Sequence, residues 1–406
     1  MKIFRFFITR IFLKRWILCI SMILLLFAAN YLTFTVARSI ASTFQGYQEI
    51  KKLDKEGIYV ANLDPDSESD FGEITKEETQ RIYDYLNKSF HYALYTDGFI
   101  VSLPNDENME VSLNYVNEGY YNLNQFELSQ GEGLYFDYQF DKEEIPVLIG
   151  KGLSKTYPIG SIIKVTDSVV EQPITLKVKG VLKSNACHSN FYALNSKTYY
   201  NFSIFLPVNE KFIEHANIDF HVNGLTDIVV FQSSIEKNEE LSEYIQENLG
   251  LKFNFHSQKE NYVFFKDYYL SSLRVILLIT VALLIIITCL SIWNASVSIR
   301  LMLKDFTINL LVGLSYSKLR KVLYFYFGVL FFINSIVITL ITAYNRYGFW
   351  LRKDTLFVTY GLFGLIGIDW FALLIVIFFD IIIGIIVVES MVRKIKKIPI
   401  SLGVLQ

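Results

Sequence analysis

The chain has 406 residues, of which 52% are hydrophobic and 16% are aromatic, and its formal net charge is −2. Such a composition fits either a large hydrophobic core or a membrane part joined to a soluble part, and it gives no sign of a nucleic-acid partner. With only three cysteines, a disulfide-rich scaffold is excluded.

Four apolar runs are long enough to cross a membrane. At ~1.5 Å of rise per helical residue, a run of about 22 residues reaches roughly 33 Å, and the hydrocarbon layer is ~30 Å thick. The first run is too long for the apolar part of a secretion signal and is not followed by a clean cleavage site, so we expect an uncleaved anchor. The sequence predicts four transmembrane helices, at residues 16–37, 273–295, 322–344 and 362–388.

Basic residues concentrate on one side of these runs. They lie in three segments: 1–15, 296–321 and 389–406. Lysine and arginine near membrane spans prefer the cytoplasm, and the only acids in these segments are Asp305 and Glu389. We therefore expect a basic N-terminal helix, a loop and a tail on the cytoplasmic side of a bacterial cell membrane. Residues 38–272 and a short loop at 345–361 then lie outside.

The large outer segment, residues 38–272, is acidic. It contains 20 Lys and Arg against 35 Asp and Glu, a formal net charge of −15. This surplus indicates either a cationic partner or ordinary solubility. Cys187 is its only cysteine, so it must be stabilised by its own core rather than by an internal disulfide.

Strand and helix patterns divide the outer segment into two lobes. Residues 56–107 and 223–257 each show strand-like and helical runs, which predicts one α/β lobe assembled from both ends of the segment. The helix in the first part begins at Thr75, whose hydroxyl forms a capping box with Glu78. Residues 108–222 contain mostly strand-like runs and predict a second, mainly β lobe.

Two motifs resemble catalytic or ligand sites without matching them. The run "GKGLSKT" at 150–156 lacks the first glycine and the Ser or Thr after the lysine that a phosphate-binding loop requires. Cys187 and His188, with His215 and His221 further on, match no zinc spacing. No catalytic constellation stands out, so we expect a non-catalytic chain without a metal or cofactor of its own.

The connection between the second and third predicted membrane helices is short, partly charged and broken by a glycine. Gly313 is expected to end the helix that precedes it, and Ser315 to cap the next one. The product is a short helix at about 303–312 on the cytoplasmic side. Such an amphipathic connector either lies on the membrane surface or docks a partner.

This stretch carries a resemblance to a known family. "KDFTINLLVGLSYSKLRKVLYFYF" resembles the Arg-Glu-Ile-Gly-Ile-Leu-Arg-Ala-Leu-Gly-Ala-Ser signature of the MacB/FtsX-like permeases of type VII ABC transporters. Lys304 and Asp305 stand at its Arg-Glu positions, Ile308 at its second Ile, and Gly313 and Ser315 at its Gly and Ser. The outer run from "GEGLYF" to "VKGVLKS" and the end "VRKIKKIPISLGVL" are similar to other patterns of that family.

The resemblance implies a fold, partners and a function. The fold is an α-helical membrane protein with four transmembrane helices and an extracytoplasmic α/β and β domain between the first two. Its lobes would be a "porter" lobe (56–107 and 223–257) and a "sabre" lobe (108–222). Residues 303–312 would be a coupling helix that binds one of two copies of a separate ATPase, which holds ATP and Mg. The residues implied in coupling are Lys304, Asp305, Phe306, Ile308, Gly313 and Ser315.

A permease of this kind works with a second copy or homologous permease, sometimes with an adaptor outside the membrane. ATP hydrolysis in the partner would move the outer domain and export or expel a peptide, antimicrobial or lipid-linked substrate. The alternative is an FtsX-like signalling subunit that regulates a cell-wall enzyme or sensor without transport.

One acid lies deep in the predicted fourth span. Asp380 is 11 residues from Asp369 and 9 from Glu389, which places it near the middle of the bilayer. An ionised carboxylate facing lipid there costs about 3 kcal/mol, so the side chain should face protein, be protonated, or both. We weigh Asn334 and Thr288 as its partners. Its role is either helix packing or dimer contact, or else a role in a substrate path or in transmission.

Overall fold

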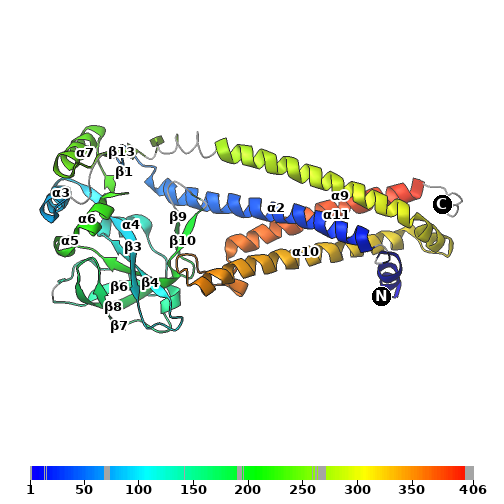
Figure 1. The fold of residues 1–406 in the computed structure, drawn as a ribbon, viewed down its shortest axis with the longest axis horizontal. Helices are drawn as coiled ribbons and strands as arrows, with labels where there is room; N and C mark the ends of the chain where they lie inside the picture. The colour runs from blue at the N-terminus through cyan, green and yellow to red at the C-terminus, as the bar shows by residue number, and fades with distance from the viewer. Residues whose placement is uncertain are drawn as a thin grey trace. The chain divides into compact units, whose positions relative to one another are not determined.

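The computed structural model describes residues 2–12, 14, 16–67, 74–140, 142–189, 194, 196–257, 259–260, 263 and 271–397 (Figure 1). The parts of the predicted segments 38–272 and 389–406 that fall on other residues lie outside this description. The chain divides into two compact units. The helical unit comprises Met1–Ser42, Ser271–Asn345 and Gly367–Gln406, and the mixed unit comprises Thr43–Leu270 and Arg346–Ile366.

Within the described residues, four helices are long and apolar enough to cross a membrane, as the sequence predicts. They are α2 (Trp16–Ile50), α9 (Ser271–Leu311), α10 (Tyr316–Arg352) and α11 (Gly367–Lys397). Before them lie the short helix α1 (Lys2–Phe7) and a π-helical turn, η1 (Ile8–Phe12). All four long helices extend past the C-terminal ends of the predicted spans, because apolar composition marks the hydrocarbon layer while the backbone hydrogen bonds continue into water.

The start of the last long helix differs from the prediction. The sequence places a span at 362–388, whereas α11 begins at Gly367 and Leu362–Gly364 forms the 3-10 turn η7. Phe363 there has a positive φ of 58°, a conformation that an α-helix does not accept. The helix therefore starts after this turn.

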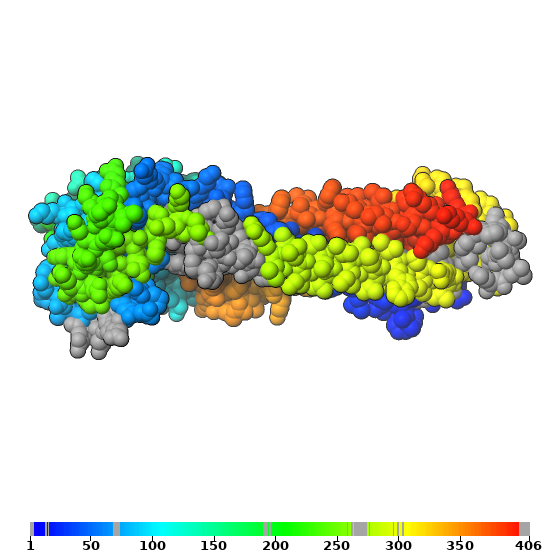
Figure 2. All heavy atoms as spheres, turned by 90° about the horizontal axis from the view of Figure 1, so that it is seen from above, coloured from blue at the N-terminus to red at the C-terminus, as the bar shows by residue number. Residues whose placement is uncertain are grey.

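The helical unit has a core of its own. Figures 1 and 2 show α9 beside α11, and residues of α1, η1, α2, α9, α10 and α11 form one buried cluster. α9 is the least covered of the four helices, with apolar side chains such as Leu278 and Trp293 about two-thirds exposed at 69% and 67%. Such a surface fits lipid or another protein better than water.

One sheet of the mixed unit has four antiparallel strands in the order β13-β1-β12-β2. They are β13 (Phe253–Ser257), β1 (Tyr59–Leu63), β12 (Val229–Phe231) and β2 (His91–Ala93). The helices α3 (Lys76–Ser89) and α7 (Ile235–Leu249) pack together, with Tyr85 and Tyr244 at 4.5 Å between ring centroids. This sheet draws on both ends of the outer segment. α3 begins with the predicted capping box, since Thr75 N donates to Glu78 Oε2 at 2.9 Å.

The second sheet has seven strands in the order β3-β4-β11-β6-β8-β5, with β7 paired to β8. They are β3 (Tyr95–Ser102), β4 (Glu110–Val116), β11 (Ser203–Pro207), β6 (Ile145–Ile149), β8 (Gln172–Leu182), β5 (Leu128–Gly131) and β7 (Ile162–Asp167). A separate ribbon joins β9 (Cys187–Ser189) to β10 (Lys197–Tyr199). The helices α4 (Glu118–Asn124), α5 (Glu210–His215) and α6 (Ile218–Leu225) complete the unit.

The predicted lobe boundary at residue 107 differs from the structure. The predicted α/β lobe at 56–107 includes residues 95–102, but this strand, β3, pairs antiparallel with β4 from Tyr95↔Val116 to Ser102↔Glu110. The two strands form a hairpin, so residues 95–102 belong to the seven-stranded sheet. Strand composition alone does not reveal the pairing partner.

The segment between α10 and α11 is part of the mixed unit. Asn185 holds its backbone twice, since Asn185 Nδ2 donates to Tyr360 O at 2.7 Å and Asn185 Oδ1 accepts from Tyr360 N at 2.8 Å. Trp350 packs edge-on against Phe202 at 5.8 Å, and Val358 is fully buried in the core. The sequence predicts a short external loop at 345–361, but α10 extends to Arg352 and residues 346–366 form a docked segment.

We expect Asn185→Ala to loosen this segment, because the variant leaves both backbone groups of Tyr360 without the amide. A buried polar group left unsatisfied costs about 1–3 kcal/mol. Hydrogen exchange of residues 346–366 should become faster, and urea unfolding of the mixed unit should occur at lower concentration.

The matched control is Asn248→Ala, since Asn248 Nδ2 donates to Tyr244 O within its own helix at 2.8 Å. Exchange in residues 346–366 that is equal in the two variants would contradict the role of Asn185.

Candidate functional site

The connection between α9 and α10 is a tight turn built by two residues. Gly313 has a φ of +104°, and Leu314 N donates to Asn309 O at 3.0 Å. This left-handed position favours glycine because a side chain would strain it. Ser315 Oγ then accepts from Lys318 N at 3.3 Å at the start of α10. α9 thus ends, and α10 begins, where the sequence predicts.

The predicted short helix at 303–312 is not a separate element. α9 is continuous through Leu311, since neither glycine nor proline interrupts its hydrogen bonds before Gly313. The candidate coupling segment is therefore the last turns of a long helix, and we call residues 304–313 the α9 end.

The α9 end has one exposed and one buried face. Lys304 is exposed and Asp305 half-buried; Ile308, Leu311 and Val312 are 44%, 58% and 84% exposed. This exposed face combines charge with apolar side chains, as protein-docking surfaces do.

Among the predicted coupling residues, Phe306 is buried within the chain and is not exposed to a partner. Its side chain is 1% exposed and belongs to the buried cluster of the helical unit. It lies on the opposite side of the helix from the exposed residues, so its role is to fix the position of the α9 end.

The N-terminal residues supply the surface on which Phe306 packs. Its ring stacks on Phe7 at 6.1 Å with an interplanar angle of 14°, and lies 6.4 Å from Phe12. Phe12 in turn stacks on Tyr326 of α10 at 3.9 Å. We call this set (Phe7, Phe12, Phe306 and Tyr326) the aromatic brace. The basic residues of 1–15 predict only a cytoplasmic helix, whereas its phenylalanines are the sequence signal for this packing.

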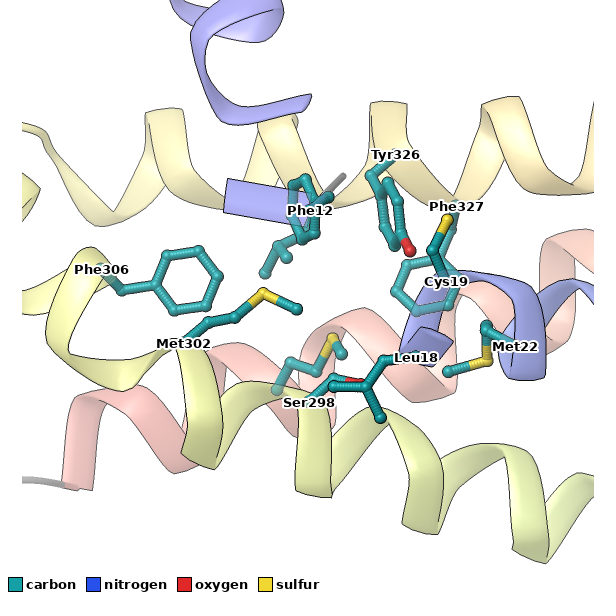
Figure 3. A pocket seen from close by; sticks show the side chains of 11 residues that line it. Phe12, Leu18, Cys19, Met22, Ser298, Met302, Phe306, Tyr326 and Phe327 are labelled. Carbon is teal, nitrogen blue, oxygen red and sulfur yellow. The ribbon is translucent and has the colours of Figure 1, made fainter. Parts of the chain in front are cut away.

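Little empty space remains beside the brace. Figure 3 shows Phe306 and Met302 of α9 with Phe12 and Tyr326 around a small void. Its volume is about 10 Å³, near the lower limit for one water molecule. η1, which carries Phe12, is a π-helical turn, a form frequent at functional sites. The α9 end is thus held firmly from inside while its other face stays open.

A second candidate site is the polar layer in the middle of the long helices. Asn30 Nδ2 of α2 donates to Asp380 Oδ2 of α11 at 3.0 Å, and the two residues are 0% and 4% exposed. Asn334 of α10 is also buried, at 1%. Within the described residues, neither Asn334 nor the half-buried Thr288 hydrogen-bonds Asp380. Asn30, which sequence analysis did not weigh, is the partner instead.

Charged pairs bracket this polar layer on α11. Asp369 is paired with Arg38 of α2 at 3.0 Å. Towards the other end, Glu389 is paired with Arg320 of α10 at 3.2 Å and accepts from the Tyr324 hydroxyl at 3.1 Å. Asp369 and Glu389 are therefore structural and connect neighbouring helices.

The mixed unit contains a polar cleft of about 360 Å³. Glu49 Oε2 accepts from Ser189 N at 2.8 Å, and Glu49 Oε1 is 3.2 Å from Lys197 Nζ. Burial raises the pKa of the Cys187 thiol to about 11 and lowers the pKa of His188, so Cys187 is a protonated thiol at neutral pH.

The described residues include no cluster of three potential metal ligands.

Two residues set aside by sequence analysis have structural roles. His221 is buried, with Nδ1 at 2.7 Å from Thr79 Oγ1 and Nε2 at 2.8 Å from Ile213 O. Burial lowers its pKa, so it stays neutral. Gly150 lies where β6 meets the backbone at Tyr200, and a Cβ there would clash with Tyr200 O. The glycine thus allows close packing rather than phosphate binding.

No family model matches the chain, and no match is found among curated proteins. Solved structures do resemble part of it. The extracellular domain of the ABC-type transporter YknZ from Gram-positive bacteria is 16% identical with a TM-score of 0.31, covering 48% of this chain and 99% of that one. The periplasmic region of MacB from Actinobacillus actinomycetemcomitans is 14% identical with a TM-score of 0.31, covering 53% and 95%. Likenesses this distant carry no argument about function.

We expect Phe306→Ala to destabilise the helical unit by about 3–5 kcal/mol, because it leaves a cavity in the aromatic brace. Thermal unfolding of the full chain in detergent or nanodiscs measures the effect. Ile308→Ala, two residues away on the exposed face, should change stability by less than about 0.5 kcal/mol. Equal losses in both variants would contradict the assignment of buried and exposed faces.

Proposed function

We propose that the chain is the permease subunit of an ABC transporter of the MacB/FtsX-like kind, and that the α9 end is the site where a separate ATPase subunit binds. The observation that carries this proposal is the α9 end itself. Its outer face offers Lys304, Ile308 and Val312, while Phe306 fixes the inner face in the aromatic brace. A surface that transmits force must be both accessible and rigidly held.

The continuity of the long helices supports a mechanical role. α2 and α10 each begin in the helical unit and end in the mixed unit without a break in their hydrogen bonds. After α10, residues 346–366 are fixed to the core of the mixed unit by Asn185 and Val358. Movement of the long helices would thus act on the mixed unit through ordered backbone, as in shear or hinge transitions.

The cargo is proposed at the level of class. The mixed unit would act outside the membrane on a peptide, antimicrobial or lipid-linked substrate, which the permease exports or expels. A second copy of the chain or a homologous permease would complete the membrane part, and α9, the least covered helix, offers it apolar surface. ATP and Mg would be bound by two copies of the ATPase partner, and an adaptor outside the membrane would extend the path.

The FtsX-like alternative uses the same coupling but moves no substrate. This alternative is supported by the formal charge of −15 on residues 38–272, because an acidic surface favours binding of a cationic enzyme or sensor of the cell wall. Transport of a labelled peptide by vesicles that contain permease and ATPase distinguishes the two, because the signalling subunit would hydrolyse ATP without moving the peptide.

We expect the combined variant Lys304→Glu, Asp305→Lys, Ile308→Ala to lose its ATPase partner in co-purification from the native membrane. Association should weaken by about tenfold or more, equivalent to ~1.4 kcal/mol, and ATPase activity in the recovered complex should fall with it.

The control is Lys155→Glu, a charge reversal at a side chain that is 88% exposed in the mixed unit. Wild-type association by the combined variant would exclude the α9 end as the binding site.

The proposal also requires the α9 end and the mixed unit to lie on opposite sides of the membrane. In a chain whose three cysteines are replaced, we expect a membrane-impermeant maleimide to label Lys155→Cys on intact cells. Val312→Cys, 84% exposed, should react only after the cells are opened. Labelling of both on intact cells would overturn this topology.

A further inference from the structure

If Asp380 is ionised, its contact with Asn30 contains only one hydrogen bond and leaves one oxygen of each side chain without a donor. Asn30 Nδ2 donates to Asp380 Oδ2, but the other oxygen of each group, Asn30 Oδ1 and Asp380 Oδ1, is buried and has no hydrogen-bond partner in the described part of the chain. A carboxylate and an amide oxygen both only accept hydrogen bonds. Two buried acceptors on one pair therefore lack a hydrogen, and each such group is costly.

One proton would satisfy both oxygens. A neutral carboxylic acid has one O–H donor, so Asp380 Oδ1–H would donate to Asn30 Oδ1 while Asn30 Nδ2–H donates to Asp380 Oδ2. The planar acid and the planar amide would then form a cyclic pair with two parallel hydrogen bonds.

The charges nearby do not favour the ionised form. The acids nearest to Asp380 along α11 are Asp369, which pairs with Arg38 of α2, and Glu389, which pairs with Arg320 of α10. These acids lie 11 and 9 residues from Asp380, about 16 and 14 Å along the helix. Each has its own arginine, whereas among the described residues Asp380 has no ion pair. A lone ionised carboxylate at this depth is costly.

Asn334 of α10 is the third buried polar side chain in this layer. A Cβ at Gly384 of α11 would meet the Phe331 ring of α10 at 3.0 Å, and Tyr324 bonds Glu389, so the two helices run antiparallel. Their register places Asn334 level with Asp380. Both amide atoms of Asn334 are buried without a partner in the described chain, so it brings polarity but no positive charge.

We propose that Asp380 is a proton-binding site inside the membrane, and that the proton joins α2 to α11 through a neutral acid–amide lock with Asn30. The proton is bonded to Asp380 Oδ1 and hydrogen-bonded to Asn30 Oδ1. Binding and release of the proton change only this O–H bond. Its loss would leave a buried negative charge facing an amide oxygen, which would weaken the contact between α2 and α11. This inference goes beyond the proposed function and does not depend on an ATPase.

Infrared spectroscopy of the full chain at neutral pH in a maltoside detergent, which has no carbonyl group of its own, tests the lock. The carbonyl band of a protonated carboxylic acid is separate from the bands of carboxylates, and we expect one that Asp380→Asn removes. Asp369→Asn, an acid on the same helix with an arginine partner, should keep the band. Asn30→Leu should keep Asp380 protonated but shift the band, because the acid loses its amide partner.

Labelling of the aspartate carboxyls with carbon-13 assigns the band without a change at Asp380, in case Asp380→Asn does not fold. An acid band that is the same in wild type and Asp380→Asn would overturn the proposal. So would an aspartate acid band that Asn30→Leu leaves unmoved, because the lock requires the two side chains to share the proton.

Discussion

Uninterrupted backbone hydrogen bonding along α2, α9, α10 and α11 is the constraint on which the rest of the structure depends. In hydrocarbon each peptide group must be satisfied within its own helix, so these elements are stiff over their full length. The side chains then have only to set the register between helices. Polar contacts do this at three levels, through Arg38–Asp369, Asn30–Asp380 and Arg320–Glu389.

The two ends of α9 and α10 differ in what holds them. At their connection, Gly313 and Ser315 form an exposed turn. The aromatic brace packs only against the buried face of α9. Beyond the other end of α10, residues 346–366 are locked into a β-rich core by Asn185 and Trp350. One end is thus exposed and the other is packed into the mixed unit, an asymmetry that the proposed coupling to an ATPase would use.

The polar layer has a different character from these ends. Asn30, Asn334 and Asp380 are almost fully buried. The proposed proton between Asn30 and Asp380 and the open amide of Asn334 make this layer sensitive to a single proton or a small shift of helix register. Hydrogen bonds between membrane helices are individually modest, at about 0.6 kcal/mol on average. A layer that is partly satisfied therefore stabilises the bundle only slightly and leaves it free to change.

The sequence by itself determined the features that depend on neighbouring residues. Apolar length predicted the four spans, the Thr75–Glu78 spacing predicted a helix start, and Gly313 predicted a helix end, because each needs only hydrogen bonds within a few residues. The α9 end was singled out by the resemblance of residues 304–315 to the permease signature, which is also a local pattern.

Only the tertiary structure decided which distant groups meet. Asn30 and Asp380 are 350 positions apart, and Asn185 and Tyr360 are 175 apart. The burial of Phe306 likewise depends on Phe7, which is distant from it in the sequence. Many polar and aromatic residues are equally suited to such contacts, and helix packing and strand register select one pair among them. Those choices are made by the sum of many side-chain contacts across the fold, which no local pattern contains.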